Sequence, residues 1–180
     1  MTTSFEYRYA PLTFEVRGAG PEAVGVVSGV VLKYGELASI APGMSERFLA
    51  GAFGDMSKVD AIANVQHDRN RPLARSGGGL VLIDTPSELR AEITLPPTAV
   101  GRDAKVLIEQ KVLRGLSVEF GEVRDRMIGA TRQVESAKLY GLGVVDRPAY
   151  PGAQIEAVRA LMQEAVALAS LKRTVLYRML

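Results

Sequence analysis

Short apolar segments separated by turns constrain the fold more than any other feature of this sequence. Residues 24–34 are rich in β-branched side chains, which favour strands, and they contain glycines typical of the bends that curve a sheet. Residues 80–84 and 89–95 are two apolar segments joined by turn residues, which predicts a hairpin. Many such segments and few helical ones predict a mainly-β α+β fold, with a curled antiparallel sheet or a barrel and helices packed outside it.

Two stretches instead carry the apolar spacing of a helix. One is short and covers about residues 104–111. The other is long, because residues 155–179 contain neither glycine nor proline and their apolar side chains recur at helical spacing. We therefore predict two parts, a domain of residues 1–153 and a helical C-terminal extension of residues 154–180.

The composition disfavours several classes of site and partner. The 180 residues include no cysteine, which excludes disulfides, thiolate nucleophiles and cysteine–zinc sites, and the single histidine disfavours a histidine-rich metal site. We therefore expect no metal or cofactor. The net charge of +2, without a dense basic run, disfavours nucleic acid as a partner. The sequence also shows neither a signal peptide nor an apolar run of the ~20 residues that a membrane span needs, so we expect a cytoplasm-like compartment.

One predicted strand carries a candidate nucleophile. In residues 115–121 apolar and polar positions alternate, so that Ser117 and Glu119 share the polar face. The only histidine, His67, ends a predicted strand over residues 60–68. A serine hydroxyl becomes a good nucleophile when a base such as a neutral imidazole accepts its proton. Ser117 and His67 are thus the candidate nucleophile and base. The alternative for each is a structural role, since no Gly-x-Ser-x-Gly elbow is present.

Four stretches of the chain, taken in order, resemble the motifs of one protein family. They are residues 40–53, with Ala41-Pro42-Gly43; residues 65–74, with Gln66-His67-Asp68; residues 113–120, with Leu116-Ser117-Val118-Glu119; and residues 139–151, with Gly141-Leu142-Gly143-Val144-Val145-Asp146-Arg147-Pro148. Over roughly residues 24–153 the chain resembles the prohead proteases of tailed phages, capsid-maturation serine peptidases that share a fold with herpesvirus assemblin. The resemblance implies that Ser117 attacks the scissile carbonyl and that His67 takes its proton.

The third catalytic group is where the chain departs from this family. Many relatives carry a glutamate in the closing motif that orients the histidine, and the matching position here is Gly141, which has no side chain. Glu119 is the preferred substitute, because its Cβ lies roughly 6–7 Å from that of Ser117 on the same face of a regular strand. Glu135, in the segment that leads into the closing motif, is the second candidate. The third alternative is that a water takes this place or that no group does.

The resemblance also implies a function and its setting. It implies a serine endopeptidase that cleaves scaffold segments or the major capsid protein during maturation, inside an immature capsid in the bacterial cytoplasm. It implies no metal or cofactor, and it leaves a homo-oligomer and self-cleavage of the extension at residues 154–180 open. The rival hypothesis is a protease-like component of a capsid or gene-transfer particle that has lost catalysis. Gly141 favours this rival, whereas the presence of Ser117 and His67 disfavours it.

Overall fold

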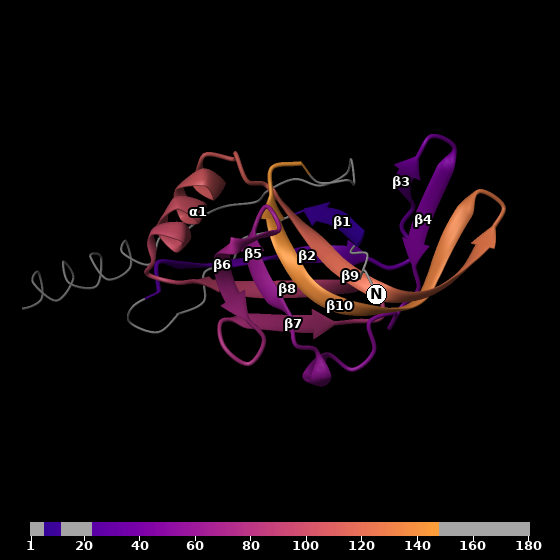
Figure 1. Cartoon of the computed structure of the whole chain (residues 1–180), viewed down its shortest axis with the longest axis horizontal. Helices are drawn as coiled ribbons and strands as arrows, with labels where there is room; N and C mark the ends of the chain where they lie inside the picture. The colour runs from indigo at the N-terminus through magenta and orange to yellow at the C-terminus, as the bar shows by residue number, and fades with distance from the viewer. Residues whose placement is uncertain (1–5, 12–22, 148–180) are drawn as a thin grey trace, which may run out of the picture.

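The computed structural model of the chain describes residues 6–11 and 23–147, which form two separate sheets and one α-helix (Figure 1). The larger sheet has the order β1-β9-β10-β4-β3, with β5 paired to β10 and to β6, and the smaller sheet has the order β2-β8-β7. The elements are β1 (Glu6–Pro11), β2 (Gly25–Lys33), β3 (Ala38–Ala41), β4 (Met44–Phe48), the short 3-10 helix η1 (Met56–Lys58), β5 (Ile62–Val65), β6 (Asp68–Arg75), β7 (Leu80–Asp84), β8 (Glu88–Leu95), α1 (Ala99–Glu109), β9 (Gly115–Ile128) and β10 (Thr131–Val145).

The long hairpin of β9 and β10 organises the larger sheet (Figure 1). Two strands share the other edge of β10, and both run parallel to it: β4 pairs with residues 131–134, and β5 pairs with residues 141–144. The pairing of β10 with β9 is irregular between these two segments, and such bulges bend a strand pair. The beginning of β9, where Ser117 lies, is therefore flanked by the end of β10 and then by β5.

One cluster of buried apolar side chains joins the two sheets. Leu116, Val118 and Phe120 of β9 are fully buried in it, and Phe120 packs edge-on against Phe48 with ring centroids 5.0 Å apart. Burying each side chain of this size stabilises the fold by roughly 1.5–3 kcal/mol. Because the core takes alternate residues of β9, Ser117 and the other residues between them face the opposite side of the sheet.

The structure confirms a mainly-β fold with a helix beside the sheets, and it corrects two details. The sheets do not close into a barrel, and the larger one is mixed rather than antiparallel, because β4 and β5 run parallel to β10. Each of these strands reaches β10 through a long connection, which lets the chain return in the same direction. The predicted extension at residues 154–180, with its helix, lies outside the described residues.

Local boundaries also differ from those predicted. The helix begins at Ala99, earlier than expected, because the hydroxyl of Thr98 accepts a hydrogen bond from the backbone N–H of Gly101 at 3.2 Å and caps it. Residues 38–48 form the β3–β4 hairpin. The hairpin predicted for residues 80–95 is present as β7 and β8.

Candidate active site

The polar face of β9 holds two of the predicted site residues. Ser117 has no exposed surface and Glu119 is only 2% exposed, although both lie on the side of β9 that faces away from the core. Across the hairpin, Ser117 pairs with Gly143 and Glu119 pairs with Gly141. The two glycines of β10 have no side chains, so the space beside the Ser117 hydroxyl and the Glu119 carboxylate is not filled from this strand.

A tight turn between β5 and β6 presents the histidine to this face. Gln66 and His67 have φ values of 54° and 57°, and a two-residue hairpin loop of type I′ requires positive φ at both positions. Neither residue is a glycine, so each stores local strain, typically of about 1–3 kcal/mol. The backbone N–H of Gln66 donates a 3.0 Å hydrogen bond to the carbonyl of Val144, which ties the turn to β10.

His67 and Ser117 are in direct contact. The Nε2 atom of His67 lies 2.7 Å from the Oγ atom of Ser117, within hydrogen-bond range. The imidazole rests on the bare backbone of Gly143, where an added Cβ would lie 2.7 Å from Nε2, 2.8 Å from Cε1 and 2.9 Å from Cδ2. Real Cβ contacts are essentially never this short, so the ring occupies this place only because position 143 has no side chain.

The surroundings of His67 keep its ring neutral. Burial, and to a smaller extent the positive charge of Arg69, lower the pKa of His67 from 6.5 to about 4. At neutral pH the imidazole therefore carries one proton. When that proton is on Nδ1, the Nε2 lone pair can accept the hydroxyl proton of Ser117. This is the protonation state that a general base needs.

Glu119 is the carboxylate that the structure brings to His67. Its Oε1 atom accepts a hydrogen bond from the guanidinium of Arg69, at the beginning of β6. Its Oε2 atom lies 3.9 Å from the Nδ1 atom of His67, which is longer than a hydrogen bond. This oxygen is buried and accepts no hydrogen bond within the part of the chain that the structure describes. The carboxylate thus stands close to the imidazole while it is bound to an arginine.

No acid could take this place from position 141 without a change in the sheet. An added Cβ at Gly141 would lie 2.7 Å from the backbone carbonyl oxygen of Ile62 in β5 and 3.2 Å from Oε2 of Glu119. The first contact is with backbone and cannot be relieved by a rotamer change. The carboxylate of Glu119 lies in the space in front of Gly141, on the neighbouring strand.

Glu135, the second candidate acid, lies elsewhere. Its side chain forms ion pairs with Arg126 at 3.2 Å and with Arg124 at 3.8 Å, on the distant half of the β9–β10 hairpin. Arg124 is seven residues along β9 from Ser117, which corresponds to roughly 20 Å in a strand. The structure therefore brings Ser117, His67 and Glu119 together and leaves Glu135 outside this group.

Two residues near the site were not predicted from the sequence. Arg69 gave no signal, because its contact with Glu119 depends on how β6 lies against the sheet. Asn64 is fully buried, pairs in register with Gly143 on the side opposite Ser117, and its amide atoms form no hydrogen bond among the described residues. A polar residue in an otherwise apolar strand two positions before the turn was the available signal for Asn64.

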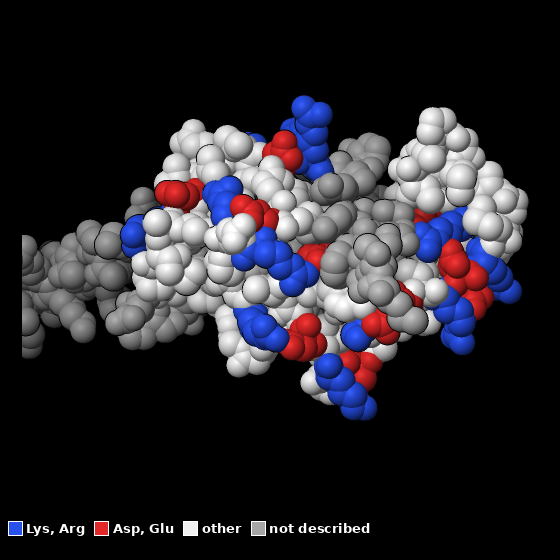
Figure 2. Space-filling model, in the orientation of Figure 1, with Lys and Arg blue, Asp and Glu red and all other residues white. Residues whose placement is uncertain are grey.

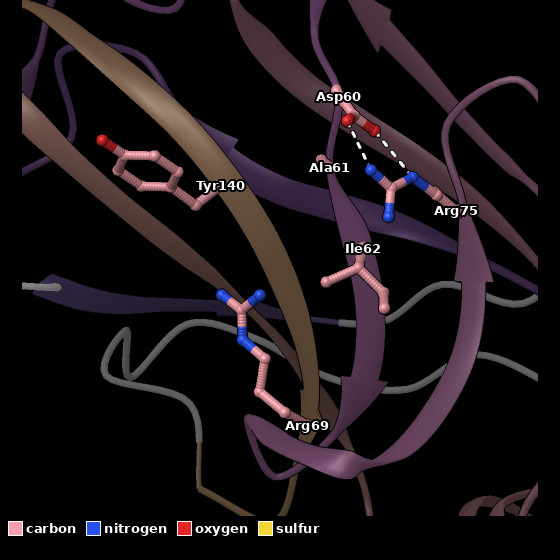
Figure 3. A pocket seen from close by; sticks show the side chains of 6 residues that line it. All are labelled: Asp60, Ala61, Ile62, Arg69, Arg75 and Tyr140. Atoms are coloured by element: carbon pink, nitrogen blue, oxygen red, sulfur yellow. Dashed lines mark hydrogen bonds and ion pairs between the residues drawn. The ribbon is translucent and has the colours of Figure 1, made fainter.

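A pocket of about 270 Å³ adjoins the Glu119 end of this group (Figure 3). Arg69 links the two, since it lines the pocket and binds Glu119, and Ile62 of the pocket pairs with Gly141, the cross-strand neighbour of Glu119. At the far side of the pocket, Arg75 and Asp60 form a bidentate ion pair with hydrogen bonds of 2.8 and 2.5 Å. The lining residues are Asp60, Ala61, Ile62, Arg69, Arg75 and Tyr140. This is a volume suited to a side chain rather than to a large ligand.

Neither a metal-binding cluster among the described residues nor a patch of one charge on the face in Figure 2 accompanies this site. No group of three or more potential metal-ligating side chains occurs among the described residues. On the face shown in Figure 2, basic and acidic side chains are interspersed. Within the described ranges, 6–11 and 23–147, no helix has the length and apolar character needed to cross a membrane.

Comparisons with known proteins identify one family and one similar fold. The sequence model of the family described as "Caudovirus prohead serine protease" matches residues 13–167. The fold is similar to that of the bacteriophage T4 capsid assembly protease, gp21, with a TM-score of 0.54 and 11% sequence identity over 80% of this chain and 98% of the other. No curated protein sequence matches the chain. The family match extends past residue 153, where we predicted the domain to end.

Proposed function

The chain belongs to the caudovirus prohead serine protease family, and we propose from this that it is a serine endopeptidase that cleaves scaffold segments or the major capsid protein during capsid maturation. The observation that carries the proposal is the 2.7 Å contact between Ser117 Oγ and the ring of the only histidine in the chain. Fifty residues separate the two in sequence, so that local structure does not explain their contact.

The geometry supports a two-step acyl transfer. His67 accepts the hydroxyl proton as Ser117 attacks the scissile carbonyl carbon, and the resulting imidazolium donates that proton to the leaving amine. A water molecule then attacks the acyl-enzyme by the same route and releases the second product. Glu119 would stabilise the imidazolium, provided that its Oε2 atom approaches Nδ1 more closely than 3.9 Å.

The pocket beside Glu119 is suited to hold a side chain of the bound peptide. It is lined by residues of β5, β6 and β10 and of the segment just before β5, and one of them, Arg69, also contacts Glu119 of the proposed catalytic group. We place the protein inside the immature capsid, within the host cytoplasm, because prohead proteases act there. Self-cleavage that removes residues 154–180 remains part of the proposal. It requires the purified wild type to shorten on incubation while Ser117→Ala stays intact.

A catalytically inactive, protease-like component of a capsid is the second candidate. Two observations favour it: Ser117 has no exposed surface, and Glu119 is bound by Arg69 rather than by His67. The first predicts that substrate cannot reach the hydroxyl, and the second predicts that the imidazole receives little help from the carboxylate.

Co-expression with the cognate capsid protein distinguishes the two candidates. Wild type should shorten the capsid protein, whereas Ser117→Ala should leave it at full length because the nucleophile is absent. The length is measured by intact-protein mass spectrometry of the assembled particles. If the capsid protein has the same mass with either variant, the enzyme hypothesis is wrong and the structural one is favoured.

A further inference from the structure

Arg69 connects the pocket with the group that contains Ser117, His67 and Glu119. Its side chain is 54% exposed, whereas the Glu119 side chain to which it binds is only 2% exposed. The accessible guanidinium can exchange this contact for water or for another acceptor, whereas the buried carboxylate, once released, needs another donor. Figure 3 shows Arg69 beside β10 at the wall of the pocket, where such an acceptor would approach it.

The two oxygens of Glu119 are in unequal surroundings. Oε1 is held by Arg69, while Oε2 is buried without a hydrogen bond among the described residues and lies 3.9 Å from His67 Nδ1. Buried carboxylate oxygens are nearly always hydrogen-bonded, so an acceptor in this position will move toward a donor when its other contact allows. A shift of about 1 Å would bring Oε2 into hydrogen-bond range of Nδ1.

We propose that Arg69 is a positioning residue that acts through Glu119: its contact with Oε1 holds Oε2 short of His67, and release of that contact lets the carboxylate close on the imidazole. The inference rests on the proposed function, in which His67 is the general base. The inference adds a step to that function. A group that enters the pocket and binds Arg69 would break the contact between Arg69 and Glu119. Occupancy of the pocket would then change the basicity of His67.

The charges around His67 set the sign of the effect. Arg69 from β6 and Glu119 from β9 are charged groups close to the ring, and Ser117 is in hydrogen-bond range of it. Within the turn, Gln66 hydrogen-bonds Asp146, which follows β10, while Asp68 accepts a hydrogen bond from the backbone N–H of Asn70. In the neighbouring strand β1, Tyr7 and Tyr9 are in register with Glu119 and Ser117.

Removal of Arg69 deletes a cation near the ring and frees the Glu119 anion to approach it. Both changes raise the pKa of His67.

The single histidine permits a direct test that needs no substrate. In a tag-free chain, the imidazole Cε1–H proton gives one titrating NMR signal, which belongs to His67 without further assignment. Wild type should titrate near pH 4. Arg69→Met should raise this pKa by about 1–2 units, the size expected when an opposite charge approaches within ~4–6 Å. Arg69→Lys, which keeps the charge, should stay closer to wild type.

A double-mutant cycle separates positioning from the direct charge effect. In a Glu119→Gln background no carboxylate is freed, so Arg69→Met should raise the pKa by clearly less than it does in the wild-type background. Equal shifts in the two backgrounds would mean that Arg69 acts on the ring by its own charge alone, and this would overturn the proposal. A pKa in Arg69→Met within about 0.3 units of wild type, equivalent to only ~0.4 kcal/mol, would also overturn it.

Control variants keep the result interpretable. Arg126→Met removes another arginine paired with a glutamate, Glu135, on the distant part of the hairpin, and should leave the His67 titration unchanged. If Arg69→Met does not fold, Arg69→Gln replaces it as the variant without the positive charge. Arg69→Lys remains the variant that keeps the charge. The rate at which a fluorophosphonate labels Ser117 is measured in parallel, and its acid limb should follow the NMR titration. Failure of wild type to react would count against the proposed function, while the NMR cycle still decides the role of Arg69.

Discussion

The bare backbone at position 143 supplies the sharpest test of the site. An added methyl group in Gly143→Ala would lie 2.7–2.9 Å from three atoms of the His67 ring, whereas ordinary contacts of a Cβ begin near 3.4 Å. To restore an ordinary contact the ring must therefore move by about 0.7 Å, the difference between the shortest contact and 3.4 Å. If it moves away from Ser117, the 2.7 Å contact between Nε2 and Oγ lengthens to about 3.4 Å and is no longer a good hydrogen bond.

The expected effect is on rate and not on folding. A misplacement of about 1 Å in a catalytic group can lower the rate on the order of 10²-fold, or about 2.7 kcal/mol in the activation free energy. Gly143 is not among the residues with positive φ, so an alanine fits its backbone conformation. Restriction of the unfolded chain would even add about 0.4–1 kcal/mol to the free energy of unfolding, which offsets part of the steric strain. We therefore expect a melting temperature close to that of wild type.

The assay is the second-order rate constant for labelling of Ser117 by a fluorophosphonate, followed by mass spectrometry. Gly25→Ala is the matched control, because Gly25 also lies in a strand and its added Cβ would meet only side-chain carbons at 3.8 and 4.0 Å. The control should react like wild type. Labelling of Gly143→Ala within about threefold of wild type, equivalent to only ~0.65 kcal/mol, would refute the argument that the ring depends on this glycine.

Two further predictions concern pH and the turn. Because the folded chain lowers the pKa of His67 from 6.5 to about 4, its contribution to stability is complete above pH 6.5 and is lost as the pH falls through 4, by at most about 3 kcal/mol. Denaturant melts of His67→Gln should show a correspondingly smaller loss between these pH values, and identical pH profiles would contradict the lowered pKa. Gln66→Gly should raise the free energy of unfolding by about 0.5–1 kcal/mol, because glycine adopts the observed φ of 54° without strain. A lower melting temperature would show that the contacts of the Gln66 side chain outweigh that strain.

The sequence predicted the features that depend on local alternation. The apolar positions of β9 and β8 repeat every second residue, and this period alone placed Ser117 and Glu119 on one face. The same rule gives no signal where a strand lacks an apolar face, as in β6, which carries mostly exposed or half-exposed polar side chains. It also gives no signal for the full length of β10, because Gly141, a residue that weakens a strand, here allows close approach of β5.

Only the tertiary structure decided how the candidate site is assembled. The parallel pairing of β5 with β10 places His67 against Gly143 and within hydrogen-bond range of Ser117. No sequence pattern within β5 or β10 specifies that register. The same arrangement places Arg69 on Glu119 and leaves Glu135 with two arginines far along the hairpin. The sequence by itself determined which side chains were available and which face of its strand each would occupy. Their distances depend on contacts between residues that are remote along the chain, and such contacts are fixed only when the whole sheet is packed.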